Sequence, residues 1–211
     1  MQVLSRTNQQ FLFPRELIKS HSFEKVPFDF QDRLLHDADK EATDVVAHQP
    51  TLYTAKLTGI LDWLHGLKNP GILEEKPCIT PLLLYEEGLC LDRVLLHYEG
   101  NPQSAQLIRR FVALFDLALR KSSVTIISPS FIPKSKLKEE QDLIQMVNTV
   151  ASETSFIKFN FSRIGDFWSY AVKHEYTLLV TTKNYQADLA KILFHFYKGG
   201  MWYDKLSFYL S

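Results

Sequence analysis

The chain has 211 residues, of which 45% are hydrophobic, and its 24 Lys and Arg residues balance 24 Asp and Glu residues. This length suits one large or two small globular domains, and a net charge of zero gives no field that would attract nucleic acid. No apolar run approaches the roughly 18 residues of a membrane span, and Met1–Asn8 lacks the basic and then apolar order of a secretory signal. We therefore expect a soluble, cytoplasmic protein with neither a nucleic-acid nor a membrane partner.

Residues 23 to 85 repeat in outline a pattern that returns near the end of the chain. Phe23–His48 can be laid over Phe156–Thr181 without a gap, which places the apolar strand Asp44–Ala47 on the strand Thr177–Val180. This match favours an internal repeat, although any two α/β stretches share such periodicity. The segment before Phe23 is too short for the strands and helices that the first copy lacks, so that copy is expected to be truncated.

A helical pattern and a strand complete the first copy. Leu57, Ile60, Leu61 and Leu64 have helical spacing, and Pro81–Tyr85 forms an apolar run that parallels the last strand of the chain. We therefore assign residues 1–88 to a truncated, degenerate repeat and residues 89–211 to a complete α/β domain.

The two cysteines of the chain flank this last run of the first copy. For Cys78 and Cys90 we expect a reduced pair, with a disulfide hairpin as the alternative. No group of Cys and His residues has the spacing of metal ligands, so no metal is expected.

From Leu91 onward, strand and helix patterns alternate with regularity. Strands are expected at Val94–Tyr98, Val124–Ile127, Phe156–Phe161, Thr177–Val180 and Leu206–Leu210, and helices at Gln103–Arg120, Glu139–Val150, Ile164–His174 and Gln186–Tyr197. Such alternation predicts an α/β fold with a doubly wound, mainly parallel five-stranded sheet and helices on both faces, preceded by a shortened repeat of the same α/β unit.

The turn after the strand Val94–Tyr98 is the first candidate site. A strand that stops at Glu99-Gly100-Asn101 and continues at once into a helix places backbone N–H groups at a helix N-terminus, where proteins often hold phosphate. Glu99 could contact a ribose or a bound cation, or it could cap the turn and the helix that follows. Both interpretations of Glu99 remain open at this stage.

Further polar residues should meet at the same edge of the sheet, because the carboxyl ends of parallel strands lie together. The candidate nucleotide-binding residues are Glu99, Gly100, Asn101, Ser104, Ser128, Thr181 and Thr182. Lys183 could contact a phosphate, or it could be a solvated lysine.

The run Val94–Ser104 resembles the first strand and turn of the universal stress protein family. The resemblance implies the adenine nucleotide alpha hydrolase-like fold, whose doubly wound domains often occur in tandem. In this chain Glu99 stands where the family normally has Asp. The ATP-binding members also carry the glycine-rich stretch Gly-x2-Gly-x9-Gly-Ser/Thr after the fourth strand, but Thr181–Asp188 contains no glycine. Side chains with a Cβ restrict the backbone conformations that such a phosphate cradle needs.

The resemblance implies a non-enzymatic, cytoplasmic stress-response or regulatory module, without a catalytic residue or a resident cofactor and with ATP binding weak or lost. One alternative is a working ATP or AMP site at the end of the strand Val94–Tyr98. Another is an enzyme of the wider nucleotide hydrolase-like fold, but Glu99–Pro102 does not supply the Ser-Gly-Gly type of loop that such an enzyme needs.

Aromatic residues crowd the C-terminus and predict a contact surface. Those named by the pattern are Phe194, Phe196, Tyr197, Trp202, Tyr203, Phe208 and Tyr209. Most should be core residues, and the remainder could form an apolar face that joins the two repeats, or two chains, at their last strands. The second form predicts a protein partner or self-association through the C-terminal strand region, for which a homodimer is one form.

Overall fold

The computed structural model describes residues 15–36, 49–66, 80–86, 88–161, 163–198 and 205–211. The N-terminal part contains the 3-10 helix η1 (Arg15–Leu17), strands β1 (Lys19–His21), β2 (Leu52–Lys56) and β3 (Leu82–Tyr85), and helices α1 (Phe30–His36) and α2 (Leu57–Gly66). The expected helix around Leu57 and the expected strand at Pro81–Tyr85 are therefore confirmed as α2 and β3.

The C-terminal part follows the expected alternation of strands and helices, except that the strand expected at Phe156–Phe161 runs over Glu153–Lys158. Its strands are β4 (Arg93–His97), β5 (Ser123–Ser128), β6 (Glu153–Lys158), β7 (Leu178–Thr181) and β8 (Ser207–Leu210), and its helices are α3 (Pro102–Leu119), α4 (Leu137–Val150), α5 (Ile164–Lys173) and α6 (Gln186–Lys198). Short 3-10 helices, η3 (Lys134–Lys136) and η4 (Lys183–Tyr185), precede α4 and α6.

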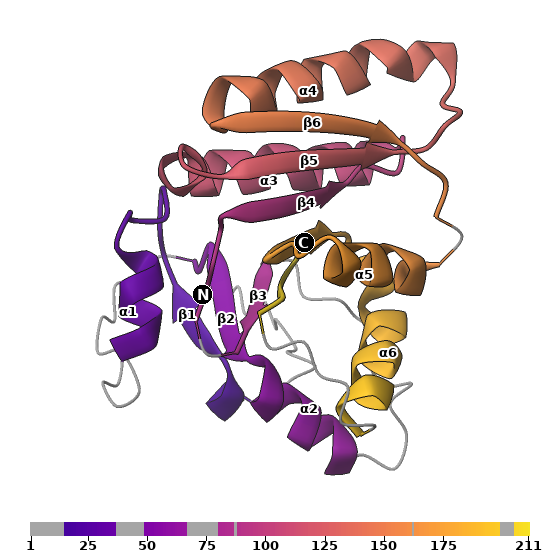
Figure 1. Cartoon of the computed structure of the whole chain (residues 1–211). Coiled ribbons are helices and arrows are strands. Elements are labelled where there is room, and N and C mark those ends of the chain that lie inside the picture. Colours follow the sequence, from indigo (N-terminus) through magenta and orange to yellow (C-terminus); the bar gives the residue numbers. More distant parts are fainter. Residues whose placement is uncertain (1–14, 37–48, 67–79, 87, 162, 199–204) are drawn as a thin grey trace, which may run out of the picture.

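All the described strands belong to one sheet of eight strands, in the order β1-β2-β3-β8-β7-β4-β5-β6. The five strands of the C-terminal part, β8-β7-β4-β5-β6, run parallel to one another, as the sequence predicted. The pair β2 and β3 is also parallel, but β3 runs antiparallel to β8. Strands β2 and β3 thus run opposite to the C-terminal strands, and β1, antiparallel to β2, runs the same way as them. Figure 1 shows α4 and β6 at one end of this sheet and α1 and α2 at the other.

Helices cover both faces of the sheet, and alternate residues of a strand pack against the helices of opposite faces. On β4, Val94 and Leu96 pack in the same core as α1, α3 and α4, whereas Leu95 packs in the core of α2, α5 and α6. Because successive side chains of a strand point to opposite faces, a central strand with both faces covered reads as a continuous apolar run. This explains the apolar run from Val94 to Leu96.

The gap-free alignment of the two copies is wrong over its first half. Phe23–Phe28, which it places on the strand Phe156–Phe161, forms no strand. Helix α1 lies on the same face as α3, through the buried side chains of Phe30 and Leu34, whereas its aligned counterpart α5 lies on the opposite face. The strand expected at Asp44–Ala47 lies outside the described residues.

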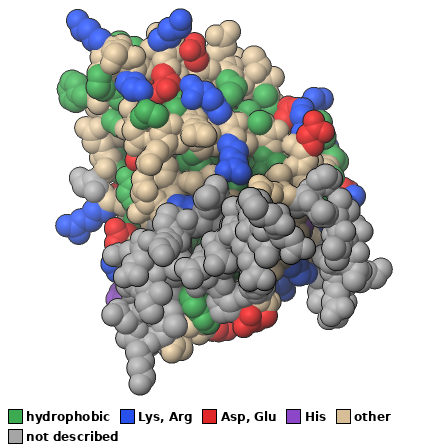
Figure 2. All heavy atoms as spheres, turned by 180° about the vertical axis from the view of Figure 1, so that it is seen from behind, with side chains coloured by type: hydrophobic (Ala, Val, Ile, Leu, Met, Phe, Trp, Pro, Cys, Tyr) green, Lys and Arg blue, Asp and Glu red, His purple; other side chains and the backbone are tan. Residues whose placement is uncertain are grey.

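The surface of the described part mixes charges of both signs. Figure 2 shows basic side chains standing singly among acidic, polar and apolar ones on the described part of the face seen from behind. Among the described helices, none combines the length and the apolar character that crossing a membrane requires.

Candidate functional site

A cavity of about 260 Å³, which we call the crevice, lies at the carboxyl ends of β4, β5 and β6, where the sequence predicted the candidate site. Its lining includes His97, Glu99, Ser128, Asn160, Phe161 and Tyr185. On one side of β4 the chain continues through α3 to β5, and on the other side lies β7, which continues through α6. Because α3 and α6 cover opposite faces, this edge is the switch point at which doubly wound sheets hold their ligands.

Asn101 and Ser104 hydrogen-bond to each other at the N-terminus of α3. Asn101 is the N-cap, and its Oδ1 accepts a hydrogen bond from the Ser104 N–H at 2.8 Å. The Ser104 hydroxyl donates to the Asn101 carbonyl at 3.0 Å and accepts from the Glu99 N–H at 3.0 Å. The first helical residue is Pro102, which has no N–H. Of the three first-turn residues, only Gln103 therefore keeps an amide that this cap does not use.

Glu99 joins the end of β4 to the end of β7. Its Oε2 accepts from the Asn101 side-chain amide at 2.8 Å, and its Oε1 accepts from the Thr182 hydroxyl at 2.9 Å. Both carboxylate oxygens are thus bound by residues of this chain. Glu99 therefore links the N-cap residue of α3 to the end of β7.

Gly100 is required by both its conformation and its surroundings. Its φ of +74° lies in the left-handed region, where residues with a Cβ are strained. A Cβ built at this position would also lie 2.9 Å from Cγ2 of Ile132. The glycine therefore shapes the turn, and the space above it is already filled by Ile132.

Ser128 is buried and bound to an ion pair beneath the crevice. Its hydroxyl donates to Oε1 of Glu140, which also receives the Lys158 ammonium at 2.5 Å. Glu140 is only 5% exposed, so this carboxylate needs both partners to offset its loss of hydration. The Ser128 side chain accordingly tethers α4 to the end of β5.

Thr181 and Lys183 are also engaged inside the protein. The Thr181 hydroxyl lies 3.0 Å from Nδ1 of His97 and is fully buried. Lys183 donates to the carbonyl oxygen of Thr80 at 2.5 Å and is only 9% exposed. The Lys183 ammonium is buried and bound to the backbone just before β3. Both expectations for Lys183, a phosphate contact and a solvated side chain, are therefore wrong.

Only Thr182 separates β7 from the short helix η4 that leads into α6. The strand ends at Thr181, η4 covers Lys183–Tyr185, and α6 begins at Gln186. The Tyr185 ring lies in the crevice, 5.5 Å from the ring of His97. Burial, and then the charge of Glu99, raises the pKa of the Tyr185 hydroxyl.

The aromatic lining of the crevice, in which His97 is central, could not be predicted from local sequence patterns. The His97 ring packs against Phe167 at 4.5 Å between ring centroids, and burial lowers the pKa of its imidazole to about 4. His97 is thus neutral near pH 7. Its place as the last residue of β4 was the signal available in the sequence, whereas nothing local marked Tyr185, Asn160 or Phe161.

Two further kinds of chemistry, metal binding and thiol reactivity, depend on the described Cys, His, Asp and Glu residues. No group of three or more His, Cys, Asp or Glu residues within the described ranges is arranged to hold a metal ion. Cys90 is a free thiol whose pKa is raised by burial, and Cys78 lies outside the described residues.

Comparison with known proteins gives similarity in fold alone. No family model matches the chain, and no curated protein matches it. Among solved structures, protein Rv1636 from Mycobacterium tuberculosis H37Rv is 16% identical, with a TM-score of 0.34 over 42% of this chain and 68% of its own. A universal stress protein in complex with cAMP is 13% identical, with a TM-score of 0.35 over 43% of this chain and 71% of its own. The family to which the turn after β4 was compared is thus represented among the structures similar to this chain.

Proposed function

We propose that the chain is a non-enzymatic stress-response or regulatory module of the universal stress protein type, in which nucleotide binding is weak or absent. One observation carries the proposal: the groups that would hold a phosphate at the end of β4 are bound to one another. Asn101 and Ser104 cap α3 internally, and both oxygens of Glu99 accept hydrogen bonds from Asn101 and Thr182.

The charge at this edge supports the same conclusion. A phosphate at the N-terminus of α3 would approach the Glu99 carboxylate, which is hydrogen-bonded to the N-cap residue itself. The phosphate and the Glu99 carboxylate would both be negative and would repel each other. The Glu99 carboxylate also already offsets the positive end of the α3 dipole. The lysine nearest in sequence after β7, Lys183, donates its ammonium elsewhere.

The absence of catalysis in this proposal also rests on geometry. Among the described residues beside the crevice, two contacts resemble a nucleophile and its base: the Thr181 hydroxyl with Nδ1 of His97, and the Ser128 hydroxyl with the Glu140 carboxylate. The Ser128 side chain is fully buried and its carboxylate partner is shared with Lys158. Thr181 is fully buried, so its hydroxyl is not accessible to a substrate. We therefore assign both pairs a packing role.

We also propose that β2, α2 and β3 are the counterpart of β7, α6 and β8. Both units are a parallel strand pair with a connecting helix, and α2 and α6 pack in the same core. The antiparallel pair β3 and β8 joins the units, with Leu83 opposite Tyr209. The truncated first copy would then comprise one strand-helix-strand unit, and β1 would cover its outer edge.

A protein partner remains part of the proposal, but β8 offers it no edge. This strand is paired with β3 on one side and with β7 on the other, and all its residues are buried. A partner or a second copy of the chain would therefore bind elsewhere. Trp202 and Tyr203, which the sequence analysis had included in this region, lie outside the described residues.

The alternative, a working nucleotide site, is favoured by the aromatic side chains of the crevice. Phe161 and Tyr185 line the cavity beside the polar side chain of Asn160. Aromatic rings of this kind can stack on a purine. This alternative predicts binding through the base, with little contribution from the phosphates.

Thermal unfolding with ATP, AMP and cAMP tests the proposal. We expect no change in Tm at millimolar concentration, whereas a ligand present at about one hundred times its Kd would add about 2.7 kcal/mol of stability. A shift that is lost in Asn160→Ala but kept in Lys138→Ala, a change of an exposed lysine on α4, would contradict the proposal and support the alternative.

A further inference from the structure

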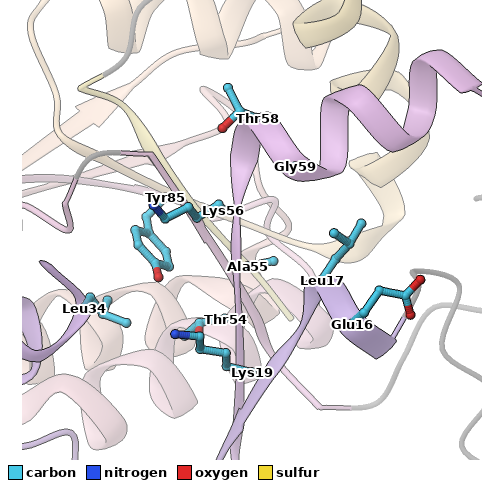
Figure 3. A pocket seen from close by; sticks show the side chains of 10 residues that line it. All are labelled: Glu16, Leu17, Lys19, Leu34, Thr54, Ala55, Lys56, Thr58, Gly59 and Tyr85. Atoms are coloured by element: carbon cyan, nitrogen blue, oxygen red, sulfur yellow. The ribbon is translucent and has the colours of Figure 1, made fainter. Parts of the chain in front are cut away.

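A second cavity, of about 500 Å³, lies at the carboxyl ends of β2 and β3 (Figure 3). Because β3 runs antiparallel to β8, this cavity and the crevice beside Glu99 lie at opposite edges of the sheet. Leu17 and Leu34 line the cavity from opposite faces of the sheet, and its polar side chains Lys19 and Tyr85 have partners within the chain. Among the described residues, unpaired backbone groups lie instead along β6, at the end of the sheet.

Strand β6 is the last strand of the eight-stranded sheet, and its only partner among the described strands is β5. We call the side of β6 that faces away from β5 its outer side. The Glu153 N–H and the Phe159 N–H both point toward β5, where they donate to the carbonyl oxygens of Ser122 and Ser128 at 3.5 and 2.8 Å. The hydrogen bonds to β5 therefore continue one residue past the end of β6.

Every second residue of β6 turns its backbone groups to the outer side. Along a strand, the N–H and C=O groups of successive residues point to opposite sides in alternation. Since Glu153 and Phe159 face β5, the residues with outward groups are Thr154, Phe156 and Lys158. No described residue hydrogen-bonds to these backbone groups from the outer side. They form a row of donors and acceptors with which a further strand can pair.

The two end strands of the sheet differ in their protection against such pairing. Strand β1 has three residues and begins with Lys19, and a short length and a lysine are common protections of an edge strand. Strand β6 has six residues and no proline. Its one lysine, Lys158, directs its ammonium to the buried Glu140 of α4 at 2.5 Å and lies over the ring of Phe156. Strand β6 is thus the less protected end of the sheet.

The same chain already joins two strands in this way at the other end of its parallel part. The five parallel strands of the C-terminal part end in β6 on one side and in β8 on the other. The outer side of β8 is paired with β3, and that pairing is antiparallel. Antiparallel pairing of a second strand with β6 would complete the C-terminal part in the same manner.

We propose that β6 pairs antiparallel with β6 of a second copy of this chain, so that two sheets become one across a two-fold axis. In the register that sets Phe156 opposite itself, Thr154 of each copy lies opposite Lys158 of the other. Each of these opposed pairs exchanges two backbone hydrogen bonds, so all the outward groups are satisfied. A two-fold contact also closes the outer sides of both copies at once.

Charge favours the antiparallel direction for two identical strands. Glu153 begins β6 and Lys158 ends it. Antiparallel pairing brings the Glu153 end of each strand to the Lys158 end of the other, whereas parallel pairing would set like charges side by side. In the proposed register Glu153 lies opposite Phe159, so no like charges face each other.

Apolar side chains along β6 add to the backbone hydrogen bonds. Phe156 and Ile157 are half-buried, on opposite faces of the sheet, and Phe159 is 50% exposed. A second strand laid beside them removes more of their apolar surface from water, which is favourable. The Phe156 side chains of the two copies form an aromatic cross-strand pair, which stabilises paired strands further.

Analytical ultracentrifugation of the full chain, from about 1 to about 100 µM, tests the proposal. We expect a mass twice that of one chain at the upper concentration, falling toward that of one chain on dilution. In Ser155→Lys the dissociation constant of the dimer should rise about tenfold or more, because the two added charges would lie on the same face near the two-fold axis. Ser155 is exposed, so this change leaves the core intact.

The matched control is Ser20→Lys, because Ser20 is an exposed serine in the middle of β1, the other end strand. This change should leave the dimer unaltered. A second variant of β6, Thr154→Pro, removes one outward N–H from each copy but none of the N–H groups that bond to β5. It should also raise the dissociation constant about tenfold or more.

Three results would overturn the proposal: the mass of a single chain at about 100 µM, an unchanged dissociation constant in either β6 variant, or an equal loss of the dimer in Ser20→Lys. The samples contain no nucleotide. The dimer can therefore fail while the proposed function stands, and nucleotide binding in the crevice can be found with or without the dimer.

Discussion

Glu99 is a residue identified from the sequence whose contacts only the folded chain reveals. The sequence placed it at the carboxyl edge of the sheet and left open a ligand contact or a cap. Its carboxylate reaches Thr182, at the end of a strand that lies far away in the sequence but next to β4 in the sheet. Only the tertiary structure could reveal that second partner.

Gly100 gives the first prediction at the scale of single residues. We expect Gly100→Ala to lower the free energy of unfolding by about 1 to 3 kcal/mol, because Ala is strained at a φ of +74° and its Cβ would crowd Ile132. Gly59→Ala is the matched control, since Gly59 lies within α2 and its Cβ would meet only an ordinary contact. That change should stabilise the protein by about 0.5 to 1 kcal/mol. Urea unfolding measures both, and equal effects would contradict the assignment.

His97 gives a prediction about pH. Burial holds the pKa of its imidazole at about 4 in the folded protein, below the value of 6.5 of an unburied histidine. The unfolded chain therefore takes up the proton first, so the stability that neutral His97 provides is fully present above pH 6.5. It is lost as the pH falls from 6.5 to about 4, by roughly 2 to 3 kcal/mol.

Replacing His97 by Phe should remove this part of the pH dependence, because the aromatic contact with Phe167 can persist without a titrating group. Urea unfolding of both proteins between pH 7 and pH 4 makes the comparison. If the variant loses stability over this interval as steeply as the parent protein, His97 does not carry the effect.

At the scale of elements, the start of α3 depends on a shared network, so its residues should not act independently. Asn101→Ala removes the N-cap and should cost about 1 kcal/mol, and Glu99→Ala should cost about 1 to 3 kcal/mol. Because Asn101 and Glu99 hydrogen-bond to each other at 2.8 Å, the double variant should lose less than the sum, by about 0.5 kcal/mol or more.

The matching control for this cycle pairs Glu99→Ala with Glu153→Ala. Glu153 is exposed and begins β6, at the opposite edge of the sheet from the crevice. Those two effects should add within about 0.5 kcal/mol. Additivity in the Asn101 cycle as well would show that the cap and Glu99 are independent.

Elements were predictable from the sequence where local pattern and final environment agree. Strands β4, β5, β7 and β8 lie where they were expected, because strands buried on both faces read as apolar runs. Strand β6, a half-exposed edge strand without such a run, begins three residues before the expected Phe156. In the first copy, β1 has three residues and α1 has seven, which is too short for a periodic signal. The face on which α1 packs is a tertiary choice that no local pattern records.

At the scale of the whole molecule, the assigned parts 1–88 and 89–211 share one sheet through β3 and β8. The apolar pattern of Pro81–Tyr85 resembles that of the last strand in the sequence. The antiparallel pairing of these two strands, however, is set by packing across the whole chain. The same arrangement gives the protein two cavities at opposite edges, of which the sequence predicted the one beside Glu99 and gave no sign of the one beside Tyr85.

We propose that the crevice beside Glu99 does not admit a triphosphate, because its polar groups are bound to one another. A crystal structure of the protein grown with millimolar ATP and magnesium tests this most directly. We predict no nucleotide density at the N-terminus of α3, with Glu99 still hydrogen-bonded to Asn101 and Thr182. Density for ATP between Gly100 and Thr182, with the Glu99 carboxylate turned away from these partners, would contradict the account.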